Sequence, residues 1–142
     1  MDITFTLIEK TNMEIILPLL QALDPSISTT VLQTRLSEMV EKGYECVGIY
    51  SGDELIGICG IWTLVKYYVG RHIEPDNVYI KATHRGLGIG KALNAWLRNL
   101  ALSRGCEAIE LNCYIKNEKG INFWASNEYI PIGMHYQKKL AK

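Results

Sequence analysis

The chain has 142 residues, of which 48% are hydrophobic and 21% are charged, so it is long enough for one domain with a buried core. Fifteen basic and fifteen acidic residues give a formal net charge of zero, which argues against a dedicated nucleic-acid-binding protein, so no nucleic-acid partner is expected. The longest uncharged apolar run, residues 55–65, is too short to cross a bilayer, and the first residues lack the basic start of a signal peptide. We therefore expect a single cytoplasmic domain over residues 1–142 with no membrane partner.

The four cysteines include no C-x-x-C pair and no histidine at metal-ligand spacing. Small buried thiols in a reducing compartment are the simplest interpretation, with a disulfide framework as the alternative. No metal site is expected from this pattern. The four positions are Cys46, Cys59, Cys106 and Cys113.

The first part of the chain predicts one strand followed by two helices. Residues 3–8 alternate as a half-buried strand does. Asn12 is then expected to cap a helix over residues 13–23, because an asparagine side chain can accept a hydrogen bond from the first helical turn. A second amphipathic helix is predicted over residues 30–42, and Gly43 is expected to end it.

The rest of the chain predicts strands that alternate with helices. Two strands, 44–50 and 54–64, are joined by turn residues at the spacing of a hairpin, and a loop is expected over residues 65–76. The remaining predicted elements are a strand at 77–82, a helix from Ile89 that Arg104 and Gly105 close, a strand at 108–114, a short helix at 118–126 and a last strand at 132–140. The order β-α-α-β-β-β-α-β-α-β indicates a mixed α/β domain.

A glycine-rich loop, Arg85-Gly86-Leu87-Gly88-Ile89-Gly90, lies between a predicted strand and a predicted helix. Its glycines leave backbone N–H groups uncovered at the positive end of the helix dipole, which predicts an anion site. The dinucleotide fingerprint G-x-G-x-x-G fails, because Lys91 and Leu93 stand where its third glycine should be. A phosphate-binding P-loop fails because Ala92 replaces the Ser or Thr that would hold magnesium. A glycine-rich turn that binds nothing is the alternative.

The charges of the chain are distributed unevenly around this loop. Residues 77–106 contain five Lys and Arg and no acid, whereas residues 1–76 carry eleven acids and five bases. A neutral chain has therefore gathered positive potential where a polyanion would bind. Arg85 and Lys91 bracket the loop, whereas Arg98 and Arg104 are expected on a solvated helix face.

The loop resembles the hallmark of the GCN5-related N-acetyltransferases, [Gln/Arg]-x-x-Gly-x-[Gly/Ala]. Downstream, Asn117, residues 120–124 and Tyr129 are similar to the family's Asn…Ala-x-x-Phe-Tyr…Gly-Phe region. The resemblance covers nearly the whole chain. It implies one N-acetyltransferase domain with a mixed sheet and a cofactor cleft between the fourth and fifth strands.

The resemblance also implies acetyl-CoA as a co-substrate, without a metal. Its pyrophosphate would lie on the amides of residues 87–91, with Arg85 shaping the loop and contacting phosphate. The pantetheine arm would pair with the backbone at Ile80 and Ala82. Asn117 would hydrogen-bond along the arm, or instead cap the last short helix. The cofactor-binding residues expected on this basis are Ile80, Lys81, Ala82, Arg85, Gly86, Leu87, Gly88, Ile89, Gly90, Lys91, Asn117 and Trp124.

The implied reaction is acetyl transfer to a primary amine of a small molecule or a protein, by direct attack on the thioester. The amine must first lose a proton, and the candidate bases are Glu74, Asp76 and Glu110. A backbone N–H near residues 80–82 would stabilise the oxyanion. His72, in the expected loop, would face substrate.

The resemblance supplies no proton donor for the leaving thiolate, because Trp124 stands where the family has a tyrosine that donates a proton. Trp124 is expected as an apolar wall beside the pantetheine sulfur, or as ordinary core. The acid would then be Tyr114, Tyr129 or solvent. The same replacement favours an alternative function, a non-catalytic acetyl-CoA-binding sensor or partner domain.

Two weaker expectations concern partners. The acidic balance of residues 1–76 favours a cationic acceptor. A homodimer is also considered.

Overall fold

The structure is a computed structural model that describes residues 2–141. The chain divides into two compact units, Met1–Leu111 and Asn112–Lys142. Each unit is described by itself below.

The first unit contains a five-stranded sheet in the order β1-β2-β3-β4-β5. Neighbouring strands are antiparallel except for β4 and β5, which are parallel. The mixed α/β fold predicted from the sequence is therefore confirmed. The strands are β1 (Ile3–Leu7), β2 (Glu45–Ser51), β3 (Glu54–Lys66), β4 (Gly70–Ile80) and β5 (Ala108–Ile109).

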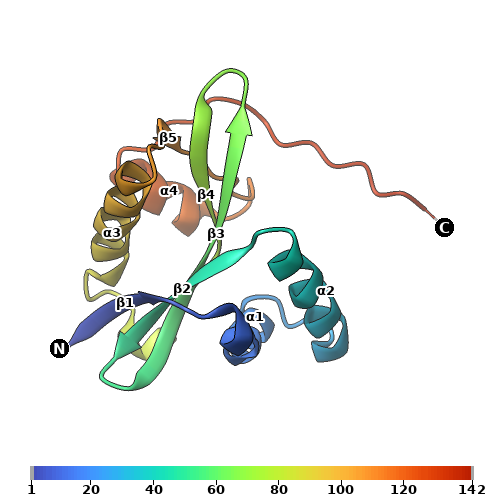
Figure 1. The fold of residues 1–142 in the computed structure, drawn as a ribbon, viewed down its shortest axis with the longest axis vertical. Helices are drawn as coiled ribbons and strands as arrows, with labels where there is room; N and C mark the ends of the chain where they lie inside the picture. The colour runs from blue at the N-terminus through green and yellow to red at the C-terminus, as the bar shows by residue number, and fades with distance from the viewer. Residues whose placement is uncertain (1, 142) are drawn as a thin grey trace. The chain divides into compact units, whose positions relative to one another are not determined.

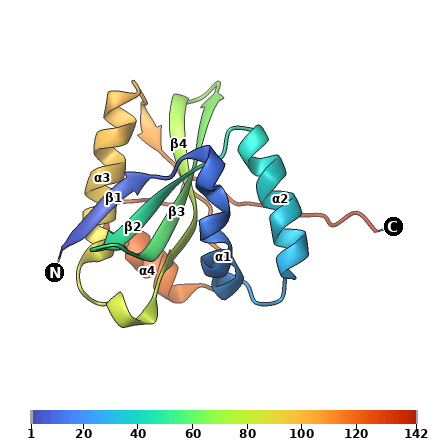
Figure 2. The same cartoon turned by 60° about the horizontal axis from the view of Figure 1, so that its bottom comes forward.

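Helices cover both faces of this sheet. The helices α1 and α2 lie on one face and α3 lies on the other (Figures 1 and 2). Each face buries its own apolar cluster, one centred on Tyr44 and Ile58 and one on Ile73 and Leu93. The helical segments are η1 (Lys10–Ile16), α1 (Leu17–Leu23), α2 (Thr29–Glu41), η2 (Ala82–His84) and α3 (Ile89–Ser103), where η marks a 3₁₀ helix.

The first helical segment differs from the prediction at its start. Asn12 lies inside the 3₁₀ segment η1 and does not cap a helix. The α-helix begins only at Leu17, next to Pro18, because proline lacks an N–H and is tolerated in a first helical turn. The second helix follows the prediction closely, since Ser28 caps it and Gly43, at φ +106°, follows its last turn.

The predicted loop at 65–76 is a strand hairpin instead. Strand β3 continues to Lys66 and β4 begins at Gly70, with Leu64 opposite His72 and Ile61 opposite Pro75. The proline concealed the strand, because proline cannot donate a hydrogen bond within a sheet.

Pro75 also explains why β5 is so short. The carbonyl of Ile73 accepts from the Glu110 N–H at 3.0 Å, and the next bond of this parallel ladder would need an N–H on Pro75. The predicted strand at 108–114 is therefore paired only over 108–109. Beyond this point no strand among residues 2–141 pairs with this edge of β4, which agrees with the predicted opening between the fourth and fifth strands.

The second unit contains the helix α4 (Glu118–Ser126). The Asn117 side chain caps it by accepting from the Gly120 N–H at 3.0 Å. The predicted strand at 132–140 is wrong, because these residues form no strand in the described part of the chain. Alternating apolar residues are not sufficient for a strand, which also needs a partner for its backbone.

Across residues 2–141, the structure contains no helix that is both long and apolar enough to cross a membrane.

Candidate active site

The glycine loop lies between η2 and α3 in the first unit. Gly86 and Gly88 have φ values of +75° and +80°, which side chains other than glycine rarely adopt. A Cβ atom added at either position would meet nothing within 4 Å, so the space above this backbone is open. Gly88 is the N-cap residue of α3 and supplies no capping side chain, which leaves the first amides of the helix uncovered. The loop is therefore an open cradle of N–H donors that fits a pyrophosphate.

Arg85 fastens the start of this cradle to the end of β4. Its Nε donates to the Ile80 carbonyl at 2.7 Å, and its guanidinium carbon lies 5.3 Å from the centre of the Tyr79 ring. This contact engages the Ile80 carbonyl, and the Ala82 carbonyl accepts from the Arg85 N–H at 3.4 Å within η2. The strand ends at Ile80 rather than at Ala82 as predicted. The Ile80 and Ala82 carbonyls therefore already accept hydrogen bonds within the protein. The expected pairing of the pantetheine arm with the backbone at these two residues stays a prediction.

Two of the five cations in residues 77–106 form ion pairs with acids from other elements. Lys81 pairs with Glu54 at 3.4 Å. Arg104 donates to both carboxylate oxygens of Glu45, at 2.7 and 2.9 Å, so the expectation that it lies on a solvated face is wrong. No ion pair within residues 2–141 involves Arg85 or Lys91. The charges of Arg85 and Lys91 therefore stay available for an anion at the loop.

The backbone of β4 contains a bulge between its two ends. Gly60 is opposite Asp76 and Ile58 is opposite Tyr79, so Asn77 and Val78 together face the single residue Cys59. Asn77 adopts φ +53°. Beyond the bulge, the Lys81 N–H donates to the Ile56 carbonyl at 2.8 Å, so by strand alternation the amides of Val78 and Ile80 point toward the open edge.

Three candidate carboxylates share one face of the sheet. Glu74 and Asp76 lie opposite Trp62 and Gly60 on the face that α1 and α2 cover. Glu110 follows β5 on the same face, and its Oε1 lies 4.0 Å from the His72 Nε2 atom. We call His72, Glu74 and Glu110 the acidic cluster. The fourth candidate, Tyr129, belongs to the second unit, and its role stays a prediction.

His72 is fully buried at the centre of this cluster, so its expected place in a loop is wrong. Its Nδ1 lies 3.1 Å from the Gly70 carbonyl oxygen and its Nε2 lies 2.9 Å from the Glu74 Oε2. Each ring nitrogen of His72 thus faces an oxygen acceptor, which fixes the orientation of the imidazole between β4 and Glu74.

Glu74 has a second cationic partner, Lys66, whose Nζ lies 3.1 Å from the same carboxylate oxygen. Burial raises the pKa of Glu74, but the hydrogen bonds from His72 and Lys66 outweigh burial and leave that pKa below its usual value. Glu110 accepts from the phenol of Tyr68, and this hydrogen bond raises the pKa of Tyr68. Glu74 is thus held as an anion by hydrogen bonds from His72 and Lys66, whereas Glu110 accepts a hydrogen bond from the neutral Tyr68 phenol and lies farther from His72, at 4.0 Å.

Lys66 and Tyr68 were not among the residues predicted from the sequence. The sequence pattern hides them because they lie on a hairpin where it predicts a loop. One ligand atom from each member of the acidic cluster lies within 4.8 Å of the others. The expected absence of a metal stays a prediction, since two carboxylates around an imidazole attract a metal ion and a protonated amine alike.

Asn94, on the second turn of α3, is a further residue that the sequence did not indicate. Its Nδ2 donates to the Gly90 carbonyl at 3.1 Å, while its Oδ1 is buried without a hydrogen-bond partner in the described part of the chain. A buried acceptor without a donor is uncommon in proteins. Only its position, one turn after Gly90 and next to the buried Leu93, marks it in the sequence.

The four cysteines are free, as predicted. Burial raises the pKa of Cys46 to about 12 and also raises that of Cys59. Neither buried thiol is therefore a thiolate near neutral pH, and neither is suited to act as a nucleophile.

In the second unit, Trp124 packs edge-on against two rings. Its ring centre lies 4.9 Å from that of Phe123 and 5.1 Å from that of Tyr129. The expected role of Trp124 beside a pantetheine sulfur stays a prediction. The helix-cap interpretation of Asn117 is confirmed, and its contact with the cofactor stays a prediction.

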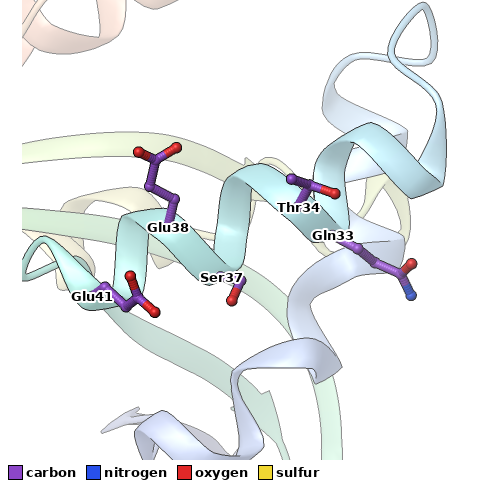
Figure 3. Close-up of a pocket in the computed structure, with 5 residues that line it drawn as sticks. All are labelled: Gln33, Thr34, Ser37, Glu38 and Glu41. Carbon is purple, nitrogen blue, oxygen red and sulfur yellow. The ribbon is translucent and has the colours of Figure 1, made fainter.

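A separate surface pocket lies on α2 (Figure 3). None of the residues expected at the site from the sequence lines it. Its described lining is polar and includes two acids: Gln33, Thr34, Ser37, Glu38 and Glu41.

Comparison with known proteins identifies the fold and the family. A family model described as the acetyltransferase (GNAT) family matches residues 13–129. The chain belongs to this family. The family membership that the glycine loop indicated is therefore confirmed. GNAT proteins share a fold that binds acetyl-CoA.

Two solved structures illustrate the GNAT fold. Ribosomal-protein-alanine N-acetyltransferase from Brucella melitensis superposes with a TM-score of 0.83 at 20% identity, covering 99% of this chain and 100% of that one. AAC(6')-Iy, in complex with the bisubstrate analogue CoA-S-monomethyl-acetylneamine, gives a TM-score of 0.82 at 14% identity with the same coverage.

Among curated proteins, the thialysine N-epsilon-acetyltransferase of Sus scrofa is 26% identical over 73 residues, which cover 51% of this chain and 43% of that enzyme. The enzyme of the same name from Mus musculus is 25% identical over 77 residues, which cover 54% of this chain and 45% of that enzyme. Each match thus spans less than half the length of these relatives.

Proposed function

We propose that this GNAT protein transfers the acetyl group of acetyl-CoA to a primary amine by direct attack. The observation that carries the proposal is the arrangement along β4. An open, positively charged amide cradle follows one end of the strand, and the acidic cluster lies toward the other end. The bulge and the open strand edge connect the two. A polyanionic thioester and a cationic amine therefore have complementary binding regions on one strand.

The cradle would hold the pyrophosphate on the amides of residues 87–91. Arg85 uses its Nε to hold the loop, and its Nη groups remain for phosphate contact. The pantetheine arm would lie along the open edge of β4 and bond the N–H of Ile80, which leaves the Val78 N–H for the thioester oxygen. This placement keeps Ile80, one of the two residues expected to pair with the arm, and uses its N–H because the Ile80 and Ala82 carbonyls are engaged within the protein.

The acidic cluster would receive the amine. Glu74, kept ionised by His72 and Lys66, would attract an ammonium group but accept a proton poorly. Glu110 has only a neutral phenol as its hydrogen-bond donor among the residues the structure describes, and it would take the proton, directly or through a water. Asp76 already accepts from the Trp62 indole at 3.0 Å and is the weaker candidate.

The free amine would then attack the thioester carbonyl carbon. The Val78 amide, which the bulge directs toward the open edge, would bind the developing oxyanion. Collapse of the tetrahedral intermediate breaks the C–S bond, and CoA leaves as a thiolate that takes a proton from Tyr129, Tyr114 or solvent. A thiol pKa of about 8.5 makes the thiolate an adequate leaving group without an acid.

We further propose a cationic acceptor with a terminal amino group on a flexible chain. Glu38 and Glu41 on the exposed surface of α2 add negative charge on the helical side of the acidic cluster. The curated relatives are named for acetylation of an ε-amino group, which agrees with such a substrate.

The proposal is tested by measuring thiol release from acetyl-CoA with a panel of diamines, lysine analogues and neutral amines. Arg85→Ala should raise the KM for acetyl-CoA roughly 10- to 150-fold, which corresponds to the loss of a charge-assisted hydrogen bond worth about 1.5–3 kcal/mol. Glu110→Gln should lower kcat by roughly 100-fold or more, with little change in that KM.

Glu9→Gln is the matched control for charge, because Glu9 is exposed between β1 and η1, and it should leave kcat unchanged. Acetyl-CoA binding in calorimetry without thiol release for any amine would support the sensor function instead. An acetylated cysteine or ping-pong kinetics would contradict direct attack.

A further inference from the structure

The bulge on β4 contains a residue in the left-handed backbone conformation, which asparagine adopts more readily than most other residues with a side chain. Asn77 has φ +53°, a left-handed conformation that is uncommon for residues with a side chain. Such a residue persists where neighbouring groups hold it in place, and residues of this kind are often found at functional sites. The structure contains two aromatic side chains that meet this need.

The first is Tyr44, which is fully buried directly after α2. Its ring extends across β3 to β4, where its hydroxyl donates to the Asn77 Oδ1 at 3.1 Å. This path exists because residue 60 is glycine. A Cβ atom at Gly60 would lie 2.5 Å from the Tyr44 hydroxyl and 2.6 Å from its ring.

The second is Trp62, which lies opposite Glu74 on the same face. Its indole Nε1 donates to the Asp76 Oδ2 at 3.0 Å, and its ring meets the Tyr44 ring edge-on at 5.3 Å between centres. The two rings thus support each other, and their polar ends hold two consecutive residues at the start of the bulge.

We propose that Tyr44 and Trp62 are positioning residues for acetyl transfer. Together they fix Asp76 and Asn77 so that the following amide, that of Val78, points toward the open edge of β4. The inference rests on the proposed function, in which this amide binds the thioester oxygen. Neither aromatic residue contacts the reacting atoms, so their effect is exerted through the backbone of the bulge.

Tyr44 also connects the bulge to the helices on the acceptor side. Gly43, at φ +106°, ends α2, and the Tyr44 N–H donates back to the Met39 carbonyl of that helix at 2.9 Å. The position of the phenol is therefore set by the end of α2. A shift of α2 when an acceptor binds would be transmitted to the bulge through this one side chain.

The test is Tyr44→Phe, which removes one oxygen atom and keeps the ring. We expect kcat to fall roughly 10- to 100-fold, as a misdirected catalytic group would cause, while the KM for acetyl-CoA changes less than about twofold. Amide hydrogen exchange at Val78 should become faster. Tyr50→Phe, on β2 and outside the site, is the matched control and should change neither quantity.

Two further variants separate positioning from general destabilisation. Asn77→Asp keeps an oxygen acceptor and tolerates positive φ, so it should retain most of kcat. Asn77→Gly removes the acceptor, and combining it with Tyr44→Phe should lower kcat no further than the worse single change. Additive losses, or unchanged kcat in folded Tyr44→Phe, would overturn the inference.

Binding separates this inference from the proposed function. Calorimetry of the wild type with acetyl-CoA and with CoA gives the contribution of the acetyl group. If the wild type binds neither, the proposed function is wrong. If the wild type prefers acetyl-CoA and Tyr44→Phe keeps the same preference, the positioning role is wrong. Loss of that preference in Tyr44→Phe, and not in Tyr50→Phe, supports it.

Discussion

The glycine loop and the acidic cluster are two polar regions of one unit that are constructed in opposite ways. The loop comes from consecutive residues and presents main-chain N–H groups, whose direction depends on the φ values of Gly86 and Gly88. The cluster comes from β4 and the end of β5, with Lys66 and Tyr68 contributed by the β3–β4 hairpin. Its charge depends on side chains that hydrogen-bond one another.

This difference predicts how each region responds to substitution. A backbone cradle tolerates most side-chain changes around it but fails when a glycine loses its conformation. A side-chain cluster keeps its fold when one member changes, but the charge and pKa values of the other members shift. The predictions below test this contrast, beginning with the largest effect.

Gly88→Val should weaken acetyl-CoA binding about 100-fold or more, because a β-branched residue resists φ +80° and the loop must turn its amides away. Calorimetry of the purified variant measures the effect. Gly52→Val is the matched control, since Gly52 has φ +59° and equally open surroundings in the turn between β2 and β3. Both variants should lose stability, but only Gly88→Val should lose affinity. Equal affinities would contradict the role of the loop.

Glu74→Gln tests the acidic cluster through its dependence on pH. In the folded state the pKa of Glu74 lies below its usual value of 4.5, so the ionised carboxylate stabilises the fold above pH 4.5. This stabilisation is lost as the pH falls through the lower, folded-state pKa. The difference in unfolding free energy between wild type and variant should therefore shrink in acid. Because Glu74 is partly exposed, we expect less than about 1 kcal/mol.

Denaturant unfolding of both proteins between about pH 6 and pH 2.5 gives this difference. Glu38→Gln, on exposed helix surface, should show no comparable pH dependence. A constant difference for Glu74→Gln across the range would mean that His72 and Lys66 do not stabilise the ionised carboxylate.

Asn94→Leu should give the smallest effect, and it tests whether the glycine loop binds its ligand through backbone groups alone. Removing a buried acceptor without a partner should stabilise the protein by about 1 kcal/mol, less the loss of the bond to the Gly90 carbonyl. If the loop binds its ligand through backbone alone, acetyl-CoA affinity should stay within about twofold. A tenfold loss of affinity would make Asn94 a ligand contact. Thermal unfolding and calorimetry measure the two quantities.

The sequence predicted the loop well because its chemistry is local. Three glycines between a strand and an apolar helix already determine an open helix N-terminus, and α3 begins at Ile89 as expected. The engagement of the Ile80 carbonyl by Arg85 was not predictable, since it depends on a side-chain rotamer.

The acidic cluster could be predicted only as a set of candidates. Glu74 and Glu110 are distant in sequence, and their proximity depends on a parallel pairing that extends over two residue pairs. The hairpin that carries Lys66, Tyr68 and His72 was missed because Pro75 argues against a strand. The last predicted strand failed for the opposite reason, since its alternation is clear and its pairing partner is not encoded locally.

Pro75 also bears on any attempt to make this protein more robust. A residue with an N–H at this position would allow the ladder between β4 and β5 to continue, which a search for greater thermal tolerance would reward. The gain would come from joining the two strands where the thioester arm is proposed to enter. The missing hydrogen bond is therefore a trade-off between stability and access, set by one imino acid in the middle of the sheet.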